Sequence, residues 1–386
     1  MRGALWLTFL LFQDEKRVLP PFNDLTRNLK ERCAPDGFLG WLHSLMLMDD
    51  TIILATSRQR ANEKIGVLRE FCRTSGMIIN ESKTQFMVIN GEKDDRNAII
   101  HDDLNITNCD MYTYFGARFT QDGRLTSSVK AQVAAKICHV VKFEAFVRRN
   151  PNASFAVKKK VFSAALIAAI LYGCESWVSA ASLKHATSMY SSCIRSLLGV
   201  RKTTATDLCL IEAGLPSLQE HVRDVQRRCI KKLTLERAND VDDPFMHVWR
   251  ITQDAGTPAF KYAKALLDNT DAERIDATRE RVLSSERSKF VTYRTMMNPA
   301  LTTHPMYTDP TVCEYKRRAL TKFRLSSHNL AIERGRWSRT PRHERLCTDC
   351  DLNAIQDEEH VLSVCPRFQI IRTDHPSVNF HLPDFL

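Results

Sequence analysis

The sequence has little of what marks repetitive, disordered or membrane-spanning proteins. Its 386 residues include only 13 glycines and 14 prolines. These are spread thinly, so we expect no long linker or low-complexity segment. No internal repeat has the period of a solenoid. No apolar run reaches the roughly 20 residues that a membrane-spanning helix needs, and the run at residues 161–173 predicts a buried helix instead. The composition is that of an ordinary globular protein.

A second apolar run and the cysteines bear on the cellular compartment. Residues 4–12 resemble the core of a signal peptide, but Gln13 and three charged residues follow without a small-residue cleavage site, which argues against secretion. The 12 cysteines are too sparse for a disulfide-stabilised fold, and nine of them lie singly on apolar segments, as buried thiols do. We therefore expect an intracellular protein, nuclear or cytoplasmic, without a membrane anchor.

The positive charge is confined to the later part of the chain. The formal net charge is +10, yet residues 1–126 hold 16 basic and 17 acidic residues. The remainder holds 39 basic and 28 acidic residues. A one-sided basic excess favours a polyanionic partner, most often nucleic acid. A soluble basic surface is the alternative that charge alone leaves open.

The hydrophobic periodicity changes at about the same place. Before residue 126 it predicts a helix at residues 61–75, ended by Gly76, and strands at residues 41–48, 51–55, 84–89 and 112–120. Residues 1–37 show no clear organisation. After residue 126 helical spacing dominates, at residues 127–149, 155–172, 182–198, 218–237, 258–290 and 313–334. The fold class predicted is α+β, with a small antiparallel sheet and a helix followed by a mainly helical part.

Asp49 and Asp50 stand side by side between two apolar runs. Adjacent carboxylates repel each other, so their position between two predicted strands needs a reason. One reading is a solvated turn, since aspartate is a favoured turn residue. The other is a site for Mg²⁺, which prefers carboxylate oxygens and whose charge removes the repulsion.

The residues that follow form a specific series. The acidic hairpin at Leu47-Met48-Asp49-Asp50 precedes a helix, then G-x-x-x-N-x-x-K-T from Gly76 to Thr84, then Tyr114-Phe115-Gly116. This order resembles the rear half of the reverse-transcriptase palm of non-LTR (LINE-type) retrotransposons. Residues 171–177 and 334–366 resemble the C-terminal region of the same family. The resemblance covers most of residues 38–370.

The resemblance implies an RNA-directed DNA polymerase, a nucleotidyltransferase that works with two Mg²⁺ ions on an RNA template and a DNA primer. It assigns Asp49 and Asp50 to the catalytic metal-binding pair and Lys83 to a place near the departing pyrophosphate. We expect the acidic hairpin to lie beside the strand that carries Lys83. Tyr114, Phe115 and Gly116 correspond to the primer grip.

The resemblance also implies an order of domains. It gives an unassigned segment at residues 1–37, a partial palm at 38–125, a helical thumb at 126–250, a basic helical connection at 251–345 and a zinc module at 346–386. The oligomeric state is left open.

Two features depart from the family pattern. Leu47 stands where the family usually has an aromatic residue. In addition, only 48 residues precede Asp49, too few for the fingers and for the strand that carries another catalytic aspartate. We therefore expect a polymerase fragment that is inactive alone and holds Mg²⁺ weakly or not at all. The alternatives are a non-catalytic, zinc-containing RNA- or DNA-binding protein derived from a retroelement, and a purely structural helical protein.

Cysteines and a histidine cluster near the C-terminus. Cys347, Cys350, His360 and Cys365 have the spacing C-x₂-C-x₉-H-x₄-C, which is typical of a structural Zn²⁺ site. The family carries such a motif after the thumb. Coincidence and a redox-active C-x-x-C are the alternatives, although no βαβ pattern surrounds the latter. We expect His360 and Cys365 on one edge of a short helix, with Val361, Leu362 and Val364 partly inward.

The segment before this cluster is the most basic of the chain. Residues 313–345 contain ten Lys or Arg and three Asp or Glu. Arginines can grip phosphates and an indole can stack on an unpaired base, so the sequence predicts nucleic-acid binding by Arg334, Arg336, Trp337 and Arg339. Further candidates are Lys158, Lys159 and Lys160. A solvated loop or charged helix face is the alternative.

Overall fold

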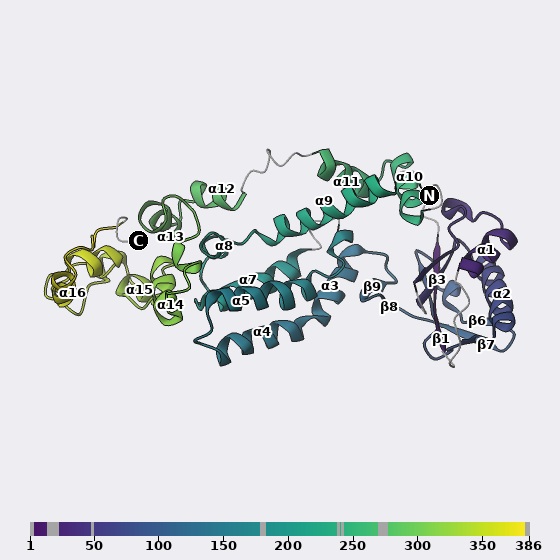
Figure 1. Cartoon of the computed structure of the whole chain (residues 1–386), viewed down its shortest axis with the longest axis horizontal. Helices are drawn as coiled ribbons and strands as arrows, with labels where there is room; N and C mark the ends of the chain where they lie inside the picture. The colour runs from purple at the N-terminus through teal and green to yellow at the C-terminus, as the bar shows by residue number, and fades with distance from the viewer. Residues whose placement is uncertain are drawn as a thin grey trace. The chain divides into compact units, whose positions relative to one another are not determined.

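The structure is a computed structural model, which describes residues 4–13, 23–47, 50–177, 183–237, 240, 243–268 and 277–382. The chain divides into two compact units, each discontinuous in sequence (Figure 1). The first, here called the sheet unit, comprises Met1–Ala135, Tyr172–Lys184 and Val222–Asn269. The second, the helical unit, comprises Lys136–Leu171, His185–His221 and Thr270–Leu386. The change predicted near residue 126 thus lies inside the sheet unit.

The sheet unit is built on one mixed sheet with the strand order β2-β3-β1-β5-β7-β6. Its strands are β1 (Leu5–Gln13), β2 (Ser44–Leu47), β3 (Asp50–Ala55), β5 (Gln85–Ile89), β6 (Ile99–His101) and β7 (Leu104–Asn108), with the short β4 (Ile78–Ile79) paired to the end of β1. Most neighbours are antiparallel, but β5 and β7 run parallel. The α+β class is confirmed, whereas the prediction of a purely antiparallel sheet is corrected.

The strand β1 comes from the segment that showed no organisation in the sequence. It lies at the centre of the sheet, antiparallel to β3 and to β5, and Leu7 and Phe9 are buried. A strand covered on both faces is apolar throughout and lacks the alternation that normally reveals a strand. With the helices α1 (Asn23–Arg32) and α2 (Arg58–Ser75), the strands β1, β2, β3 and β5 form a β-α-β-β-α-β arrangement.

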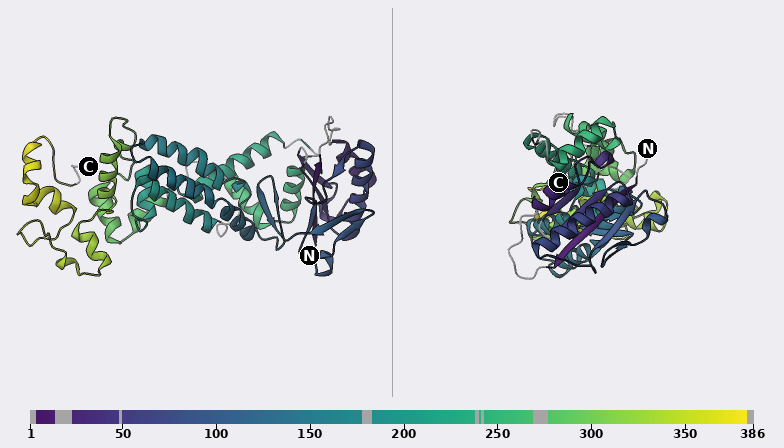
Figure 2. Two further views of the ribbon diagram at one scale, coloured as in Figure 1. Left: turned by 90° about the horizontal axis from the view of Figure 1, so that it is seen from below. Right: turned by 90° about the vertical axis from the view of Figure 1, so that its right-hand side faces the viewer.

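The two faces of the sheet have different covers. The helices α1 and α2 lie on one face, where Leu29 and Leu68 pack with Ile53 (Figure 1). In the right-hand view of Figure 2 these helices lie in front of the strands. The opposite face carries a second hairpin, β8 (Met111–Tyr114) and β9 (Ala117–Thr120). Its Tyr112 and Phe119 pack with the cluster that contains Phe9.

Local sequence explains both ends of α2. The Oγ of Ser57 accepts a hydrogen bond from the backbone N–H of Arg60. Gly76 ends the helix with φ +67°, a left-handed conformation that glycine adopts without steric cost. The predicted apolar face is confirmed, since Ile65, Leu68, Phe71 and Cys72 are buried. The helix begins three residues before the predicted start.

The remaining helices follow the predicted periodicity with local breaks. The sheet unit contains α3 (Leu125–Ala135), α10 (Pro244–Asp254) and α11 (Pro258–Asp268), and α9 (Leu218–Glu236) begins in the helical unit. The segment predicted at 127–149 is two helices, and that at 155–172 contains a π-helical turn at Phe162–Ile167. The helical unit contains α4 (Ile137–Arg149), α5 (Phe155–Val161), α6 (Ala168–Ile170), α7 (Lys184–Leu198), α8 (Thr206–Ala213), α12 (Ala277–Ser284), α13 (Ser288–Thr292), α14 (Glu314–Arg324), α15 (Ala331–Trp337) and α16 (Gln369–Asp374).

Charged side chains are buried in the interior of the helical unit. Glu212 accepts hydrogen bonds from Arg324 and from the hydroxyl of Tyr293. Glu314 pairs with Lys158 and Arg317. Such pairing offsets the cost of removing each charge from water. The apolar run at 161–173 is helical over most of its length, but only one of its faces is buried, since Ala164, Ala168 and Tyr172 are exposed, which corrects the prediction of a fully buried helix. Within the described ranges, no helix combines the length and apolar character that crossing a bilayer requires.

Candidate functional site

Asp50 is the first residue of β3 and is half-buried. Its strand neighbours are Leu47 in β2 and Leu11 in β1. The sequence placed Asp50 in a turn, but Asp50 already belongs to the strand ladder. Asp49 lies outside the described residues. Asp50 is therefore the one member of the predicted catalytic pair whose position the structure gives.

Lys83 lies in a turn that Asn80 organises. The carbonyl oxygen of Asn80 accepts hydrogen bonds from the backbone N–H groups of Lys83 and Thr84, at 3.2 and 2.9 Å. The side-chain Oδ1 of Asn80 accepts from the hydroxyl of Ser82. This turn ends just before β5 and leaves the Lys83 side chain exposed. The asparagine and lysine of the G-x-x-x-N-x-x-K-T motif thus belong to one local structure.

The acidic hairpin does not lie directly beside the strand that follows Lys83. The central strand β1 lies between β3 and β5. The prediction omitted this strand because no alternation in residues 5–13 marks them as part of the sheet. Phe9 faces Gln85 and Leu11 faces Asp50, so Lys83 is level with Leu11 along the strands. The strand β1 therefore separates Asp50 from β5, which begins two residues after Lys83.

The predicted primer-grip residues form a tight hairpin turn. Tyr114 pairs with Ala117, and Phe115 and Gly116 between them have φ values of +47° and +74°. Two successive left-handed residues are typical of a type I′ turn. A Cβ atom on Gly116 would lie 3.0 Å from the ring of Tyr172. The stretch predicted as one strand at 112–120 is therefore a hairpin, as the motif series implied.

Two tyrosines bring this hairpin to Asp50 and Lys83. The ring of Tyr112 stacks on Phe9 with centroids 3.9 Å apart, and its hydroxyl donates to the carbonyl of Lys83 at 3.4 Å. The hydroxyl of Tyr114 donates to the carbonyl of Leu45 at 3.4 Å. Burial raises the pKa of Tyr114 to about 12, and the charge of Asp50 adds to this shift. The same two causes raise the pKa of Tyr112.

Three segments far apart in the sequence thus lie at the same end of the strands of the sheet. The described residues supply a single predicted carboxylate there, Asp50. Mg²⁺ takes several oxygen ligands in near-octahedral geometry, so these residues by themselves do not make a Mg²⁺ site. The arrangement is a polar end of the strands, formed by Asp50 and the Lys83 turn, next to an aromatic hairpin.

The four residues of the C-terminal cluster come together as predicted. One ligand atom from each of Cys347, Cys350, His360 and Cys365 lies within 4.8 Å of all the others. The Sγ atoms of Cys347 and Cys365 are 4.0 Å apart, and Sγ of Cys350 lies 3.4 Å from Nε2 of His360. Tetrahedral coordination at normal Zn–S and Zn–N lengths needs separations of about 3.8 and 3.6 Å. The cluster can therefore hold a structural zinc ion.

Two short elements place these ligands. An antiparallel bridge joins Leu346 to Ile355, and the chain between them carries Cys347 and Cys350. A π-helical turn runs from His360 to Val364, and the N–H of Cys365 donates to the carbonyl of His360 at 2.7 Å. The predicted short helix is thus present as a π-helical turn. Val364 is 51% exposed, which corrects its predicted inward position.

Without a metal ion, the surroundings of the cluster favour neutral thiols. Burial raises the pKa of Cys365 to about 11, and the thiols of Cys350 and Cys347 contribute. A divalent ion among these groups reverses this preference because it stabilises thiolates. Cys347, His360 and Cys365 are buried, as the ligands of a closed structural site are.

The three adjacent lysines have three different environments. Lys158 is 1% exposed and its Nζ lies 2.7 Å from Oε1 of Glu314, so its ammonium group cannot reach a phosphate. Its predicted role in nucleic-acid binding is therefore withdrawn. Lys159 is half-buried and donates to the carbonyl of Ala213 at the end of α8. Lys160 is exposed and stays a candidate.

The four predicted nucleic-acid-binding residues around α15 also differ in their exposure and in their contacts. Arg334 and Arg339 are exposed, and neither side chain has a hydrogen bond or ion pair with the part of the chain that the structure describes. Arg336 pairs with Glu333 at 2.7 Å and donates to Ser288. Trp337 is 52% exposed and is covered on one face by Arg201. Nothing in the local sequence pointed to Arg201, because its partners lie in a distant segment.

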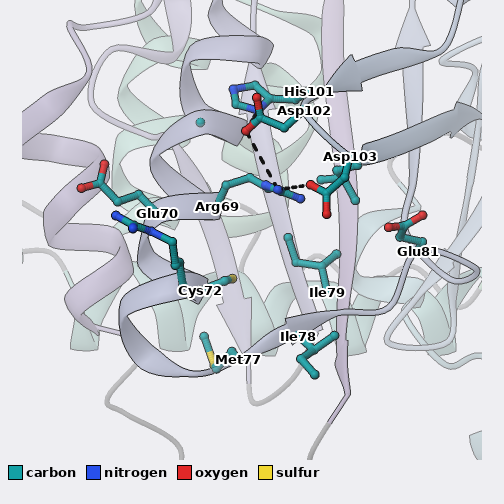
Figure 3. A pocket seen from close by; sticks show the side chains of 13 residues that line it. Arg69, Glu70, Cys72, Met77, Ile78, Ile79, Glu81, His101, Asp102 and Asp103 are labelled. Atoms are coloured by element: carbon teal, nitrogen blue, oxygen red, sulfur yellow. Dashed lines mark hydrogen bonds and ion pairs between the residues drawn. The ribbon is translucent and has the colours of Figure 1, made fainter.

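A surface pocket of about 530 Å³ lies elsewhere on the sheet unit, between α2, β4 and the β6–β7 turn. Figure 3 shows Arg69 directed between Asp102 and Asp103, with which it forms ion pairs. None of the predicted site residues lines this pocket. Acidic and basic side chains both line the pocket, namely Arg69, Arg73, Glu70, Glu81, Asp102 and Asp103.

Comparison of the chain with protein-family models and with curated proteins gave no match.

Proposed function

We propose that this chain is part of a LINE-type reverse transcriptase that binds a template–primer through a palm-like sheet and a basic helical unit. Zinc stabilises its C-terminal module. The observation that carries the proposal is that Asp50, the Lys83 turn and the Tyr114-Phe115-Gly116 hairpin lie at the same end of the strands of the sheet. These are the motif residues of the resemblance, and only long-range folding brings them together.

The arrangement of the sheet supports the same proposal. The β-α-β-β-α-β order leaves Asp50 on the face that the aromatic hairpin shares. The helices α1 and α2 occupy the other face. A hairpin with an exposed turn beside an acidic strand end is suited to hold the end of a primer, because backbone and aromatic groups position a nucleotide without reading its sequence.

The proposal does not include autonomous polymerisation. The metal-dependent reaction needs Mg²⁺ to stabilise the attacking and leaving oxygens, and the described residues offer only Asp50 to it. Lys83 is exposed and bears a positive charge, which suits a contact with phosphate. The chain's own part is thus to position nucleic acid.

Fluorescence anisotropy with a labelled RNA–DNA hybrid whose primer 3′ end is recessed tests this function. The wild type should bind with an affinity that falls steeply between about 50 and 200 mM salt, as phosphate contacts require. Phe115→Asn removes the aromatic ring but keeps the turn, since Asn-Gly is the preferred type I′ sequence. It should weaken binding of the recessed hybrid more than binding of a blunt one. Absence of salt-dependent binding would refute the proposal.

Primer extension with dNTPs and Mg²⁺ is the accompanying assay. Wild type and Asp50→Asn should both give only background extension. Extension by the wild type that is lost in Asp50→Asn would show a working polymerase site and would overturn the inactive-fragment part of the proposal.

The second candidate function is nucleic-acid binding by the helical unit alone. Arg334 and Arg339, which are exposed and have no side-chain partner among the described residues, favour it. In that case Phe115→Asn has no effect on any hybrid, whereas Arg334→Gln and Arg339→Gln weaken binding uniformly and reduce its salt dependence.

A further inference from the structure

Trp337 and Arg201 form a stacked pair on the surface of the helical unit. The Cζ atom of Arg201 lies 4.1 Å from the centroid of the Trp337 ring. Arg201 follows α7, whereas Trp337 is the last residue of α15. Folding therefore builds this pair from two segments that are distant in the sequence.

The guanidinium group of Arg201 is held firmly in place. Its Nη1 donates to the carbonyl of His328 at 2.9 Å, and its Nη2 donates to Oδ1 of Asn329. The backbone N–H of Arg201 donates to the hydroxyl of Ser327 at 3.0 Å. These bonds fix the plane of the guanidinium, so the indole above it has a rigid support.

The other face of Trp337 is open to solvent. One face is covered by Arg201, yet 52% of the residue is exposed. A tryptophan this exposed leaves a large apolar surface in water, which costs free energy unless a partner covers it. The structure thus presents a flat, rigid aromatic surface.

The surroundings of this surface are positively charged. Arg334 and Arg339 flank Trp337 in sequence, are exposed and have no side-chain partner within the described ranges. Lys202, next to Arg201, is also exposed. Arg336 is left out of this set because its guanidinium is engaged by Glu333, which also pairs with Lys289. A flat aromatic face with cations around it matches a nucleotide, which has a flat base and a phosphate.

We propose that the open face of Trp337 stacks on an unpaired nucleobase of a single-stranded RNA or DNA. Arg201 supports the indole from behind, and Arg334 and Arg339 contact the adjoining phosphates. Single-stranded nucleic acid is specified because the bases of a duplex are stacked on each other and their faces are not accessible. This inference rests on the proposed nucleic-acid binding and identifies the form of nucleic acid that the helical unit takes.

Anisotropy with three probes tests the stacking. They are a single strand of about 12 nucleotides, the same strand with central abasic sites, and a duplex of equal length. Trp337→Ala should weaken binding of the intact strand about 5- to 100-fold, the range that loss of one stacked base gives. Its binding of the abasic strand and the duplex should not change. Trp337→Phe should retain most of the affinity.

Tyr315→Ala is the matched control, since Tyr315 is an 80% exposed aromatic residue in the same basic segment and has no stacked arginine among the described residues. It should leave all three affinities unchanged. Equal losses in Trp337→Ala and Tyr315→Ala would overturn the stacking proposal, and so would equal binding of intact and abasic strands by the wild type. The second comparison needs no variant and is independent of folding defects.

The two proposals fail in different ways. Binding of all probes with no effect of Trp337→Ala refutes the stacked base but not nucleic-acid binding. Binding of none of the probes at low salt refutes both.

Discussion

The sheet unit and the zinc module, residues 346–382, are held together by different forces. In the sheet unit, clusters of buried apolar residues fill both faces of the sheet. In the zinc module several large apolar side chains are exposed, namely Leu346, Leu352, Val364, Ile370, Ile371 and Val378. The buried residues there are instead Cys347, His360 and Cys365 of the cluster and the polar Gln356 and Glu358. We therefore expect the module to depend on a bound ion, whereas the sheet depends on packing.

The largest expected effect is the loss of the zinc module on removal of the metal. A structural zinc contributes about 10–16 kcal/mol in small zinc domains, more than the module's sparse core can replace. Chelation or Cys347→Ser should abolish amide protection across residues 346–382 and leave β1, β3 and β5 protected. Hydrogen exchange read by mass spectrometry measures both regions at once.

Cys313→Ser is the control for this experiment, because Cys313 is exposed and lies outside the ligand cluster. It should keep the module protected and should keep one zinc per chain by elemental analysis. If residues 346–382 stay protected after chelation, the zinc module does not need a metal ion and does not differ from the sheet unit in this respect.

A second test concerns two lysines in α5 that differ in burial. Lys158→Met leaves Glu314 buried without one of its two cationic partners, and breaking a buried pair costs about 3–5 kcal/mol. Lys160→Met should change stability by less than about 0.5 kcal/mol and should weaken nucleic-acid binding slightly. Denaturant-dependent hydrogen exchange of the helical unit measures the change in stability, and fluorescence anisotropy measures nucleic-acid binding. Equal stability of the two variants would contradict the burial of Lys158 in an ion pair with Glu314.

A third test uses acid to perturb the sheet unit alone. Burial lowers the pKa of His43 to about 4, and the nearby charge of Lys64 adds to this effect while Asp36 opposes it. The unfolded chain binds a proton at this residue near pH 6.5, but the folded chain does not. Stability is thus complete above pH 6.5 and declines as the pH falls toward 4, by about 3 kcal/mol at 1.4 kcal/mol per unit.

His43→Leu should flatten this decline, since His43 is 2% exposed and its ring nitrogens have no hydrogen-bond partner among the described residues. Urea unfolding at pH 7.0 and pH 5.0, observed at β1 and β3, provides the measurement. An unchanged pH dependence in the variant would assign the decline to other groups.

The smallest expected effect is at the hairpin turn. Gly116→Ala forces alanine to φ +74° and places its Cβ against Tyr172, which costs about 1 kcal/mol or more. Affinity for a recessed primer should fall a few-fold. Gly76→Ala meets similar strain, φ +67°, but no atom lies within 4 Å of its Cβ. It should not change binding, so equal effects on primer affinity would argue against a role for the hairpin.

Sequence reasoning succeeded where the interacting residues are close in the chain. The residues of the Cys/His cluster span only positions 347–365, and the Tyr114-Phe115-Gly116 turn and the Gly76 helix end are set by local backbone preferences. Each pattern has few conformations that satisfy it. The α+β class and the helical character of residues 161–173 followed from periodicity and length.

Prediction was incomplete where distant segments decide the outcome. A uniformly apolar run such as residues 5–13 has no alternation that identifies a strand or selects its neighbours, so the place of β1 between β3 and β5 was missed. The charge of Lys158 suggested a surface, but Glu314 lies more than a hundred residues away and accounts for its burial. The support that Arg201 gives to Trp337 is another contact that local pattern cannot show.

The most direct test of the central claim is a photo-crosslink from the primer terminus. A DNA primer that carries 4-thiothymidine at its 3′ end is annealed to RNA, bound to the wild-type chain and irradiated, and the modified peptides are identified by mass spectrometry. The account predicts crosslinks in the β8–β9 hairpin around Tyr114, Phe115 and Gly116. Crosslinks confined to the helical unit, with none in the hairpin, would contradict it.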